Sequence, residues 1–355
     1  MTHQTTNTGG GRAAPSFPPN WLKKTVSLAF TVAITLLGLL FVTFMIGRVM
    51  PIDPVLAVIG ERASQAQYDQ VYLELGLDKP LIVQFGIYVG DVLQGDFGTS
   101  IRTGKPVAED IARVFPATLE LATLGTLLGV VLGVPLGVLA AVYRGSWIDQ
   151  LSRLIGLVGY SMPIFWLGMM GLLIFYGILG WVAGPGRLGV FYEGLVPTRT
   201  GLLLVDAIIA GDWDVFKDAL SHIILPACLL GYFSLAYISR MTRSFMLEQL
   251  NSEYVITARV KGLSEWNVVW RHAFRNIAIQ LITVIALAYA NLLEGSVLTE
   301  IIFAWPGIGS YITTSLLSND MASVLGGTVV IGTIFVCLNI LSDLLYRFFD
   351  PRAKS

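Results

Sequence analysis

Charged residues are scarce in this sequence. Asp, Glu, Lys and Arg make up 13% of its 355 residues, against roughly 25% in a typical soluble protein. Hydrophobic residues make up 54%, and the formal net charge is −1. The composition excludes an ordinary soluble domain, and without an excess of positive charge there is no reason to expect nucleic acid as a partner.

Cysteine and histidine are also rare. Cys228 and Cys337 lie in apolar runs, where a thiol usually packs as a small hydrophobic group, so we expect no disulfide. His3, His222 and His272 are far apart in the sequence, with no carboxylate or thiol nearby at the spacing of metal ligands. We therefore expect no metal site. Ser and His show no arrangement typical of acyl transfer, and we expect no catalytic residues.

A phosphate-binding loop is missing as well. No run fits G-x-x-x-x-G-K-[ST], and the nearest fragment, Gly104-Lys105, is followed by Pro106. We therefore expect that the chain does not hydrolyse ATP and binds no cofactor. Any ATP-driven work would depend on another polypeptide.

Long apolar runs are what the sequence has in abundance. Several reach the roughly 20 residues that a helix needs to cross a bilayer, and none alternates as a barrel strand does. We predict an all-α polytopic membrane protein. Its six expected transmembrane helices are 26–48, 117–143, 152–181, 220–244, 277–298 and 322–348. Pro135 and Pro163 should kink the helices that contain them.

The basic residues suggest how the chain is oriented. They gather in the two termini, in the 144–153 connection and near 252–276, whereas the short 299–320 connection has none. By the positive-inside rule, both termini and 245–276 are expected to be cytoplasmic, and 182–219 extracytoplasmic. The expected domains are a disordered tail at 1–25, a first helix at 26–48, an extracytoplasmic segment at 49–116, a transmembrane core at 117–348 and a C-terminal tail at 349–355.

Four glycines recur every fourth residue in the second expected span: Gly125, Gly129, Gly133 and Gly137. Small residues at this spacing let another helix approach closely within a membrane. The sequence leaves two interpretations open. The glycines form a packing face either within the chain or against another subunit.

A charged segment, "EYVITARVKGLSEWNVVWRHAFRN" at 253–276, interrupts the apolar runs. Ser252 is a candidate cap for a short helix that Lys261 and Gly262 would end. Ser264 is a candidate cap for a second helix, in which apolar residues recur on one face: Trp266, Val269, Trp270, Ala273, Phe274 and Ile277. The pattern fits a helix lying in the membrane interface, or a protruding elbow that inserts into a partner's groove.

The run "EYVITARVKG" followed by "RHAFRN" resembles the EAA-type signature of the permeases of bacterial binding-protein-dependent ABC importers. The form is that of the dipeptide, oligopeptide and nickel branch. Further blocks in the same order are similar to those permeases, and the likeness covers nearly the whole chain beyond the tail. They are "GDFGTSIRTGKPVAEDI", "FPATLELA", "SMPIFWLG", "HIILPA", "SRMTRS", "EGSVLTEIIFAWPGIG" and "LLYRFFDPRAK".

This resemblance implies the architecture of a type I importer permease in the bacterial inner membrane. The implied partners are a second homologous permease, two ATP-binding subunits that hold ATP and Mg, an extracytoplasmic solute-binding protein and the lipid bilayer. In the family, two short coupling helices dock into the ATPase, and the positions that match here are Glu253, Tyr254, Ala258, Lys261, Gly262, Leu263, His272, Arg275 and Asn276. Gln280 stands where the family commonly has Pro, so the fifth span should begin as a more regular helix.

Ionisable residues within spans are candidates for the transport path. Glu120, Glu294 and Asp343 each lie near a membrane boundary, where they can simply reach the interface. If one lines a path, we expect Glu294, with Asn291 and Ser296 beside it. The run "TEIIFAWPGIGSYI" at 299–312 suggests a re-entrant hairpin, which either touches the transport route or binding protein or packs against 49–115.

The expected function is therefore a permease subunit that forms half of the pathway for di- or oligopeptides. The same importer class for nickel complexes, sugars or opines is an alternative. Another is a proton-driven secondary carrier with Glu120, Glu294 or Asp343 as a relay, although no internal repeat typical of such carriers is evident. A non-transporting scaffold that recruits proteins through 253–276 fits less well with the long extracytoplasmic segments.

Overall fold

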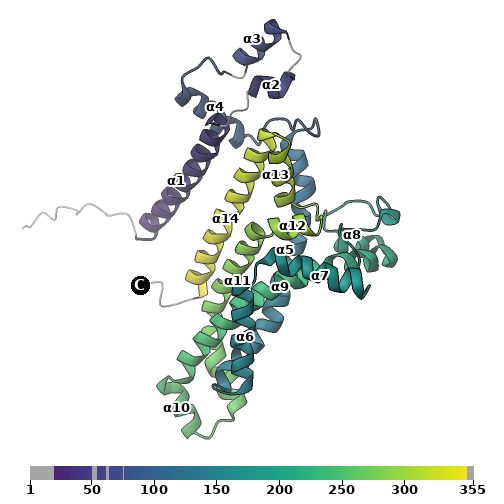
Figure 1. Cartoon of the computed structure of the whole chain (residues 1–355). Coiled ribbons are helices and arrows are strands. Elements are labelled where there is room, and N and C mark those ends of the chain that lie inside the picture. Colours follow the sequence, from purple (N-terminus) through teal and green to yellow (C-terminus); the bar gives the residue numbers. More distant parts are fainter. Residues whose placement is uncertain (1–19, 50–53, 61–63, 75, 350–355) are drawn as a thin grey trace, which may run out of the picture.

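Figure 1 shows the computed structural model, which describes residues 20–49, 54–60, 64–74 and 76–349. Within these residues all regular elements are helices. By length and apolar composition, five helices can cross a membrane, and the number rises to six if one bent pair is counted as a single broken span. The predicted class, an all-α polytopic membrane protein, is confirmed. The expectations for the ends of both tails, 1–19 and 350–355, lie outside the described residues.

The α-helices have the following bounds in chain order. They are α1 (Asn20–Val49), α2 (Pro54–Ile59), α3 (Gln65–Glu74), α4 (Leu81–Leu93), α5 (Val107–Val142), α6 (Trp147–Ser161), α7 (Ile164–Gly171), α8 (Leu203–Ala210), α9 (Trp213–Leu250), α10 (Glu253–Val260), α11 (Arg275–Gly295), α12 (Val297–Ile302), α13 (Ile308–Leu317) and α14 (Met321–Phe349). Two π-helical stretches, η1 (Leu172–Ile178) and η3 (Asn267–Phe274), adjoin α7 and α11, and a single 3₁₀ turn, η2, covers Val190–Tyr192.

Most spans are longer than the apolar runs that predicted them. The first helix begins at Asn20 instead of 26, and α5 begins at Val107, inside the segment expected to be extracytoplasmic up to 116. Helix α9 begins at Trp213, because the Asp212 carboxylate caps it by accepting from the N–H groups of Asp214 and Val215. Hydropathy detects the part of a helix that lies in lipid, whereas caps decide where the helix begins.

The third expected span, 152–181, is not one helix. α6 and α7 meet at a bend of 100°. Pro163 has no N–H to continue the helix, and it pushes Met162 into an extended conformation, with φ −93° and ψ 132°. The kink predicted at Pro163 is therefore a complete break, and it turns α7 toward the α12–α13 hairpin.

α5 and α9 form the centre of the bundle. A Cβ added to any of the four ladder glycines would meet α9: Leu230 Cβ at 2.9 Å from Gly125, the Ser234 side chain at Gly129, the Leu235 carbonyl at 3.1 Å from Gly133 and the Ser239 carbonyl at 2.5 Å from Gly137. The ladder thus packs within the chain. Of the two interpretations left open by the sequence, the structure shows the intramolecular one.

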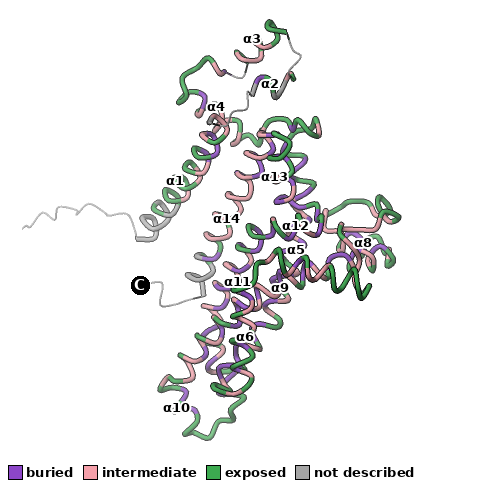
Figure 2. Tube along the Cα trace, in the orientation of Figure 1, coloured by how far each residue is buried: buried purple, intermediate pink, exposed green. Residues whose placement is uncertain are grey.

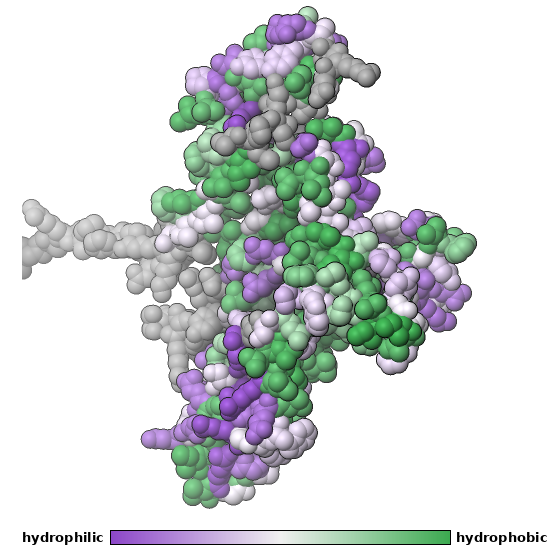
Figure 3. Space-filling view, in the orientation of Figure 1, coloured by the Kyte–Doolittle hydropathy of each residue, from purple (hydrophilic) through white to green (hydrophobic). Residues whose placement is uncertain are grey.

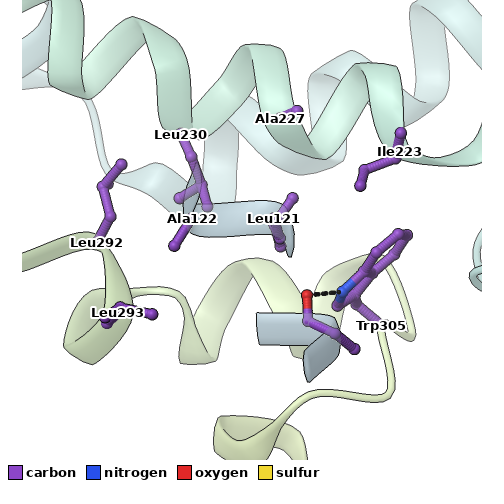
Figure 4. Packing of buried hydrophobic residues seen from close by; sticks show 9 residues of the cluster. Leu121, Ala122, Ile223, Ala227, Leu230, Leu292, Leu293 and Trp305 are labelled. Carbon is purple, nitrogen blue, oxygen red and sulfur yellow. Dashed lines mark hydrogen bonds between the residues drawn. The ribbon is translucent and has the colours of Figure 1, made fainter. Parts of the chain in front are cut away.

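The core around this contact also includes α11 and the α12–α13 turn. Figure 4 shows Leu121 and Ala122 of α5 facing Ile223, Ala227 and Leu230 of α9, with Leu292 and Leu293 of α11 alongside. The buried Trp305 indole donates from Nε1 to the Ala117 carbonyl at 2.9 Å. This hydrogen bond attaches the turn between α12 and α13 to α5 in the part of α5 that contains Pro116.

Burial and hydropathy agree with a membrane environment. Figure 2 shows α1 largely exposed beside the more buried bundle, and its exposed side chains include Phe30, Ile34, Leu37 and Phe41. Figure 3 shows hydrophilic residues gathered at the end that carries α10 and at the end that carries α3, with hydrophobic surface between them. Exposed apolar side chains in the middle of the molecule are expected where lipid is the solvent.

Buried carboxylates attach the long connections to the bundle. Glu120 accepts from Arg187 Nη2 at 2.6 Å and from the Leu204 N–H at 2.8 Å. Asp320 accepts from the Ser100 and Ser323 hydroxyls, at 2.5 and 2.8 Å. Burial by itself would raise the pKa of Asp320, but these hydrogen bonds hold the pKa below its ordinary value. Glu120 was expected to reach the membrane interface or to line a path; instead it is buried and paired.

The 299–312 hairpin packs against the bundle. Ile308 and Tyr311 join a buried cluster with Val107, Ile111 and Val114, so the hairpin contacts the last part of the 49–115 segment, which was one of the two expectations. Glu300 lies inside the hairpin, fully buried, and accepts from Thr118 Oγ1 at 2.7 Å and the Ser310 N–H at 2.8 Å. Its carboxylate thus satisfies N–H groups at the start of α13.

The α5–α9 contact yields a first prediction. In Gly129→Ala the new Cβ would lie 2.5 Å from Ser234 Cβ and 3.0 Å from the Leu235 N, so we expect a loss of about 1–3 kcal/mol of stability from overpacking. Thermal unfolding of the purified full chain in detergent measures it. Gly156→Ala in α6 is the matched control, because nothing lies within 4 Å of the added Cβ. Equal melting temperatures for the two variants would contradict the close packing of α5 on α9.

Candidate functional site

The charged segment forms a protruding elbow, which we define as α10, the turn 261–264 and the helix that runs from Glu265 to Asn276. Figure 1 shows it at the end of the bundle opposite α3. Gly262 has φ +78°, a conformation that favours glycine. Its N–H donates to the Arg259 carbonyl at 2.9 Å, and the Leu263 N–H donates to the Ala258 carbonyl at 3.2 Å. This pair of bonds is the Schellman motif, so Gly262 ends α10 as the sequence predicted.

The start of α10 differs in detail from the expectation. Ser252 occupies the N-cap position, but its hydroxyl makes no capping bond. It donates instead to the Glu248 carbonyl at 3.2 Å, in the last turn of α9. The break between α9 and α10 is therefore short, and the two helices are linked through local backbone contacts.

The second elbow helix is continuous with the fifth span. The stretch Asn267–Gly295 is one 29-residue apolar helix, whereas the sequence suggested a separate short helix before 277. α11 runs through Gln280 without interruption, as expected from the absence of Pro at that position. A displacement of the elbow thus acts directly on a membrane-spanning helix.

Except for Trp266, the apolar stripe of this helix faces the protein. Val269, Ala273 and Ile277 are buried against Val138 and Ala141 of α5 and Met246 of α9. Trp270 and Phe274 pack at the edge of the same cluster, with ring centroids 5.2 Å apart. The stripe therefore explains how the elbow is fixed to the bundle, and it leaves the opposite face free.

Two contacts hold the elbow helices together. Val255 and Ala258 of α10 are buried against Val268. Beside them, Arg259 Nε donates to Glu265 Oε1 at 2.8 Å and Arg259 Nη2 donates to Glu265 Oε2 at 3.2 Å. The ion pair is substantially exposed, so it contributes at most about 1 kcal/mol, and the apolar contact is the main tie.

The tip of the elbow exposes apolar side chains beside charges. Val260 is 82% exposed and Trp266 is 71% exposed. Ile256, Tyr254 and Leu263 are also exposed. A patch of large apolar side chains with a charged rim is typical of a surface that binds another protein.

The residues matched to the coupling-helix signature fall into two groups. Ala258 is buried inside the elbow and holds its helices together, and His272 is half-buried. The others are exposed: Glu253, Tyr254, Lys261, Gly262, Leu263, Arg275 and Asn276. Sequence matching alone did not separate the residue that shapes the elbow from those that form its surface.

The three residues considered for a transport path do not share one environment. Asn291 and Glu294 are exposed on α11, whereas Ser296 is fully buried and donates to Glu300 Oε1 at 3.0 Å. Ser296 therefore lines no open path in this structure. The side chain of Asp343 lies outside the described residues.

Sequence reasoning missed several residues of the elbow and its surroundings. The Arg259–Glu265 ion pair lies across the 261–264 turn, so it does not have the i, i+3 or i, i+4 spacing from which an ion pair within one helix is predicted. The sequence assigned Val260 and Trp266 to helices but did not identify them as surface residues, because exposure depends on which other segments pack nearby. Glu300 was quoted within the hairpin run, and an acidic residue in an otherwise apolar stretch was the available signal for its buried role.

The comparisons with known proteins cover both halves of the chain. Residues 133–355 match the family model described as binding-protein-dependent transport system inner membrane component, and residues 22–122 match the N-terminal model of the same system. The chain belongs to this family of transport-system membrane components. It is a multi-pass transport subunit of the bacterial inner membrane.

Two relatives show how far the similarity extends. The chain is 45% identical over 316 residues to a probable D,D-dipeptide transport system permease protein of Escherichia coli K12, which covers 89% of this chain and 92% of that protein. It is 42% identical over 319 residues to a dipeptide transport system permease protein of Alkalihalophilus pseudofirmus, covering 90% of this chain and 95% of that protein. Among solved structures, a methionine ABC transporter in inward-facing conformations is similar, with 19% identity and a TM-score of 0.48, over 65% of this chain and 92% of that chain.

No metal centre was expected, and the described residues contain no group of three or more His, Cys, Asp or Glu side chains able to hold a metal ion. Cys228 and Cys337 are free thiols.

The elbow's internal contact gives a second prediction. Val268 is fully buried between the two elbow helices, so Val268→Asp would bury a carboxylate and release α10. We expect hydrogen exchange of the 253–260 amides to rise by at least about tenfold. Val260→Asp, at an exposed site in the same peptide, should leave exchange near the wild-type rate. If both variants behaved alike, the packing of Val268 would not be what holds α10.

Proposed function

We propose that this chain is the permease subunit of an ATP-driven importer of di- or oligopeptides, and that the elbow is where an ATP-binding subunit docks. Its partners in the assembly are a second homologous permease, two ATP-binding subunits and an extracytoplasmic binding protein that delivers the solute. The chain forms half of the pathway. It binds no cofactor of its own, and ATP with Mg belongs to the partner subunits.

The observation that carries the proposal is the elbow itself. It protrudes from one end of the bundle, it exposes Val260, Leu263 and Trp266 beside Lys261, and it is continuous with α11. Large apolar side chains exposed on a protruding tip are typical of a surface that another protein covers. A groove on another protein would bury these apolar side chains, and the charged residues around them would lie at the edge of the contact.

Orientation follows from the same assignment. The basic residues near the elbow favour the cytoplasmic side by the positive-inside rule, and ATP is available on that side. The α2–α4 segment and the connection that contains α8 then face outward, toward the binding protein. Movement of the docked ATPases shifts the elbow, and α11 and α9 transmit the shift to the pathway between the two permeases.

The substrate class comes from the relatives. Both relatives described above are dipeptide transport system permease proteins, and the similarity extends over most of both chains. Nickel complexes, sugars and opines remain alternatives for the same importer class. Competition between a labelled dipeptide and these solutes in vesicles that contain the whole transporter separates them.

Glu294 is our candidate for a residue along the pathway. Its carboxylate is exposed near the end of a membrane-spanning helix, beside Asn291, and a carboxylate in contact with hydrocarbon is unfavourable. Water or a partner subunit should therefore cover this face. A carboxylate there suits the cationic amino terminus of a peptide.

A proton-driven carrier is the competing function. Its relay would require a carboxylate free to exchange protons, but Glu120 is held by Arg187 and by the Leu204 N–H. Reconstituting the purified chain alone under a proton gradient distinguishes the two functions, because the permease should transport nothing without its ATPases.

The elbow supplies a third prediction. Gly262→Pro forces a φ near −65° where the structure has +78°, so the docking turn is distorted while the spans are not. We expect co-purification with the ATP-binding subunits and ATP-driven uptake to fall by at least about tenfold, while the amount of chain in the membrane stays near normal.

Gly194→Pro is the matched control. Gly194 also has φ +78° with nothing near its Cβ position, but it lies in the connection between η2 and α8. The Gly194→Pro variant should co-purify with the ATP-binding subunits as the wild type does. Wild-type co-purification and uptake by Gly262→Pro would count against the elbow as the docking site.

A further inference from the structure

A cluster of charged side chains around one buried carboxylate joins α6 to α9 near the elbow. Asp149 lies in the first turn of α6, and its carboxylate is fully buried. Arg243 of α9 donates to both of its oxygens, from Nε to Oδ1 at 2.7 Å and from Nη2 to Oδ2 at 3.1 Å. Arg153 donates from Nε at 3.2 Å and from Nη2 at 2.9 Å, and the Gly145 N–H donates at 2.9 Å.

The contact between Arg243 and Asp149 matters more for the relative orientation of α6 and α9 than for the stability of the protein. A buried ion pair is often no more stabilising than apolar residues of similar size, whereas a two-bond guanidinium–carboxylate contact fixes the relative orientation of its partners. Arg153 is 62% exposed, but Arg243 is 20% exposed. Arg243 is therefore the partner that constrains Asp149 most tightly, and it is the one on another helix.

Two further contacts keep α6 against α9 along its length. The Tyr232 hydroxyl donates to the Ile155 carbonyl at 2.9 Å. One turn later, a Cβ on Gly159 would lie 2.9 Å from Ala236 Cβ, so the helices approach closely there. α6 is thus attached to α9 from its first turn to its last, with the charged contact at the elbow end.

Beyond α6 the chain joins a different part of the molecule. After the 100° bend, α7 packs against α12: a Cβ on Gly168 would lie 3.4 Å from atoms of Ile302 and Phe303. At the other end, α9 continues for seven residues past Arg243, about 10 Å of helix, before the elbow begins. α6 therefore lies between the elbow and the break at Met162–Pro163.

We propose that Asp149 is a positioning residue for energy coupling. Its contact with Arg243 makes α6 move with α9 when the elbow is displaced, so that the displacement reaches the Met162–Pro163 break and, through it, α7 and α12 at the opposite side of the bundle. Without the contact, the first turn of α6 is free to lag behind α9. This inference rests on the proposed function, because it requires the elbow to be moved by an ATPase.

Asp149→Asn tests the inference in the complete transporter reconstituted in vesicles. The change keeps the size of the side chain but leaves Arg243 without its ionic partner. We expect the ATP-binding subunits to co-purify normally and ATP hydrolysis to stay within about twofold of wild type, while uptake falls about tenfold, a change typical of altered coupling. The number of ATP molecules hydrolysed per solute imported is the deciding measurement.

Arg243→Lys provides a second test if Asp149→Asn fails to assemble. It keeps the positive charge and loses the two-bond fork, and we expect the same rise in ATP consumed per solute, to a smaller extent. Asp214→Asn is the control, because Asp214 is a 78% exposed carboxylate at the start of α9, paired with Lys217 at 3.7 Å. The number of ATP molecules hydrolysed per solute imported should be the same in Asp214→Asn as in the wild type.

Two results would overturn the inference. One is an unchanged ratio with normal uptake in the Asp149 and Arg243 variants. The other is a parallel loss of assembly, ATP hydrolysis and uptake in both variants, which would assign the cluster a purely structural role. Failure of the proposed function is distinguishable, since the wild-type chain would then neither retain ATP-binding subunits nor support ATP-dependent uptake.

Discussion

The close approach of α5 and α9 is the constraint on which the rest of the structure depends. In a bilayer the hydrophobic effect does not drive helices together, because lipid tails are as apolar as the side chains. Helix association therefore relies on van der Waals contact and hydrogen bonds. The glycine ladder on α5 supplies that contact by admitting α9 backbone where side chains would otherwise stand. Because α9 leads into the elbow and α5 carries the docking surface for the α12–α13 hairpin, this one helix pair connects the two ends of the molecule.

Buried carboxylates make a second set of attachments around that pair. Glu120, Glu300 and Asp320 each hold a connecting segment or helix start against the bundle, while Asp149 joins α6 to α9. In every case the oxygens are enclosed by N–H, hydroxyl or guanidinium donors, as a buried charge requires. Their directional bonds fix the placement of segments for which burial of apolar surface alone would allow several arrangements. They also explain why the few acidic residues in the apolar part of the sequence need not belong to a transport path.

Much of the fold was readable in advance because membrane helices are constrained locally. Every backbone N–H and C=O in lipid must find its partner within the helix, so apolar length alone located the spans. The stop at Gly262 was also predictable, since the left-handed conformation there is a property of one residue and its neighbours. Helix starts and the break after α6 were placed less well. The start of α9 depends on the polar contacts of the Asp212 cap. The break after α6 depends on Pro163, and the effect of a proline on a helix ranges from a mild kink to a full break.

The candidate site shows the same division. Sequence by itself determined that residues 253–276 form a short helix, a glycine stop and an amphipathic helix, because these follow from local propensity and periodicity. The tertiary structure decided that the second helix continues into α11, that Ala258 packs inside the elbow and that Val260 and Trp266 lie on its surface. It also decided that the glycine ladder is occupied by α9 and that Asp149 meets Arg243. These outcomes depend on contacts between residues far apart in the chain, and a linear pattern carries no information about which of several compatible partners a face will meet.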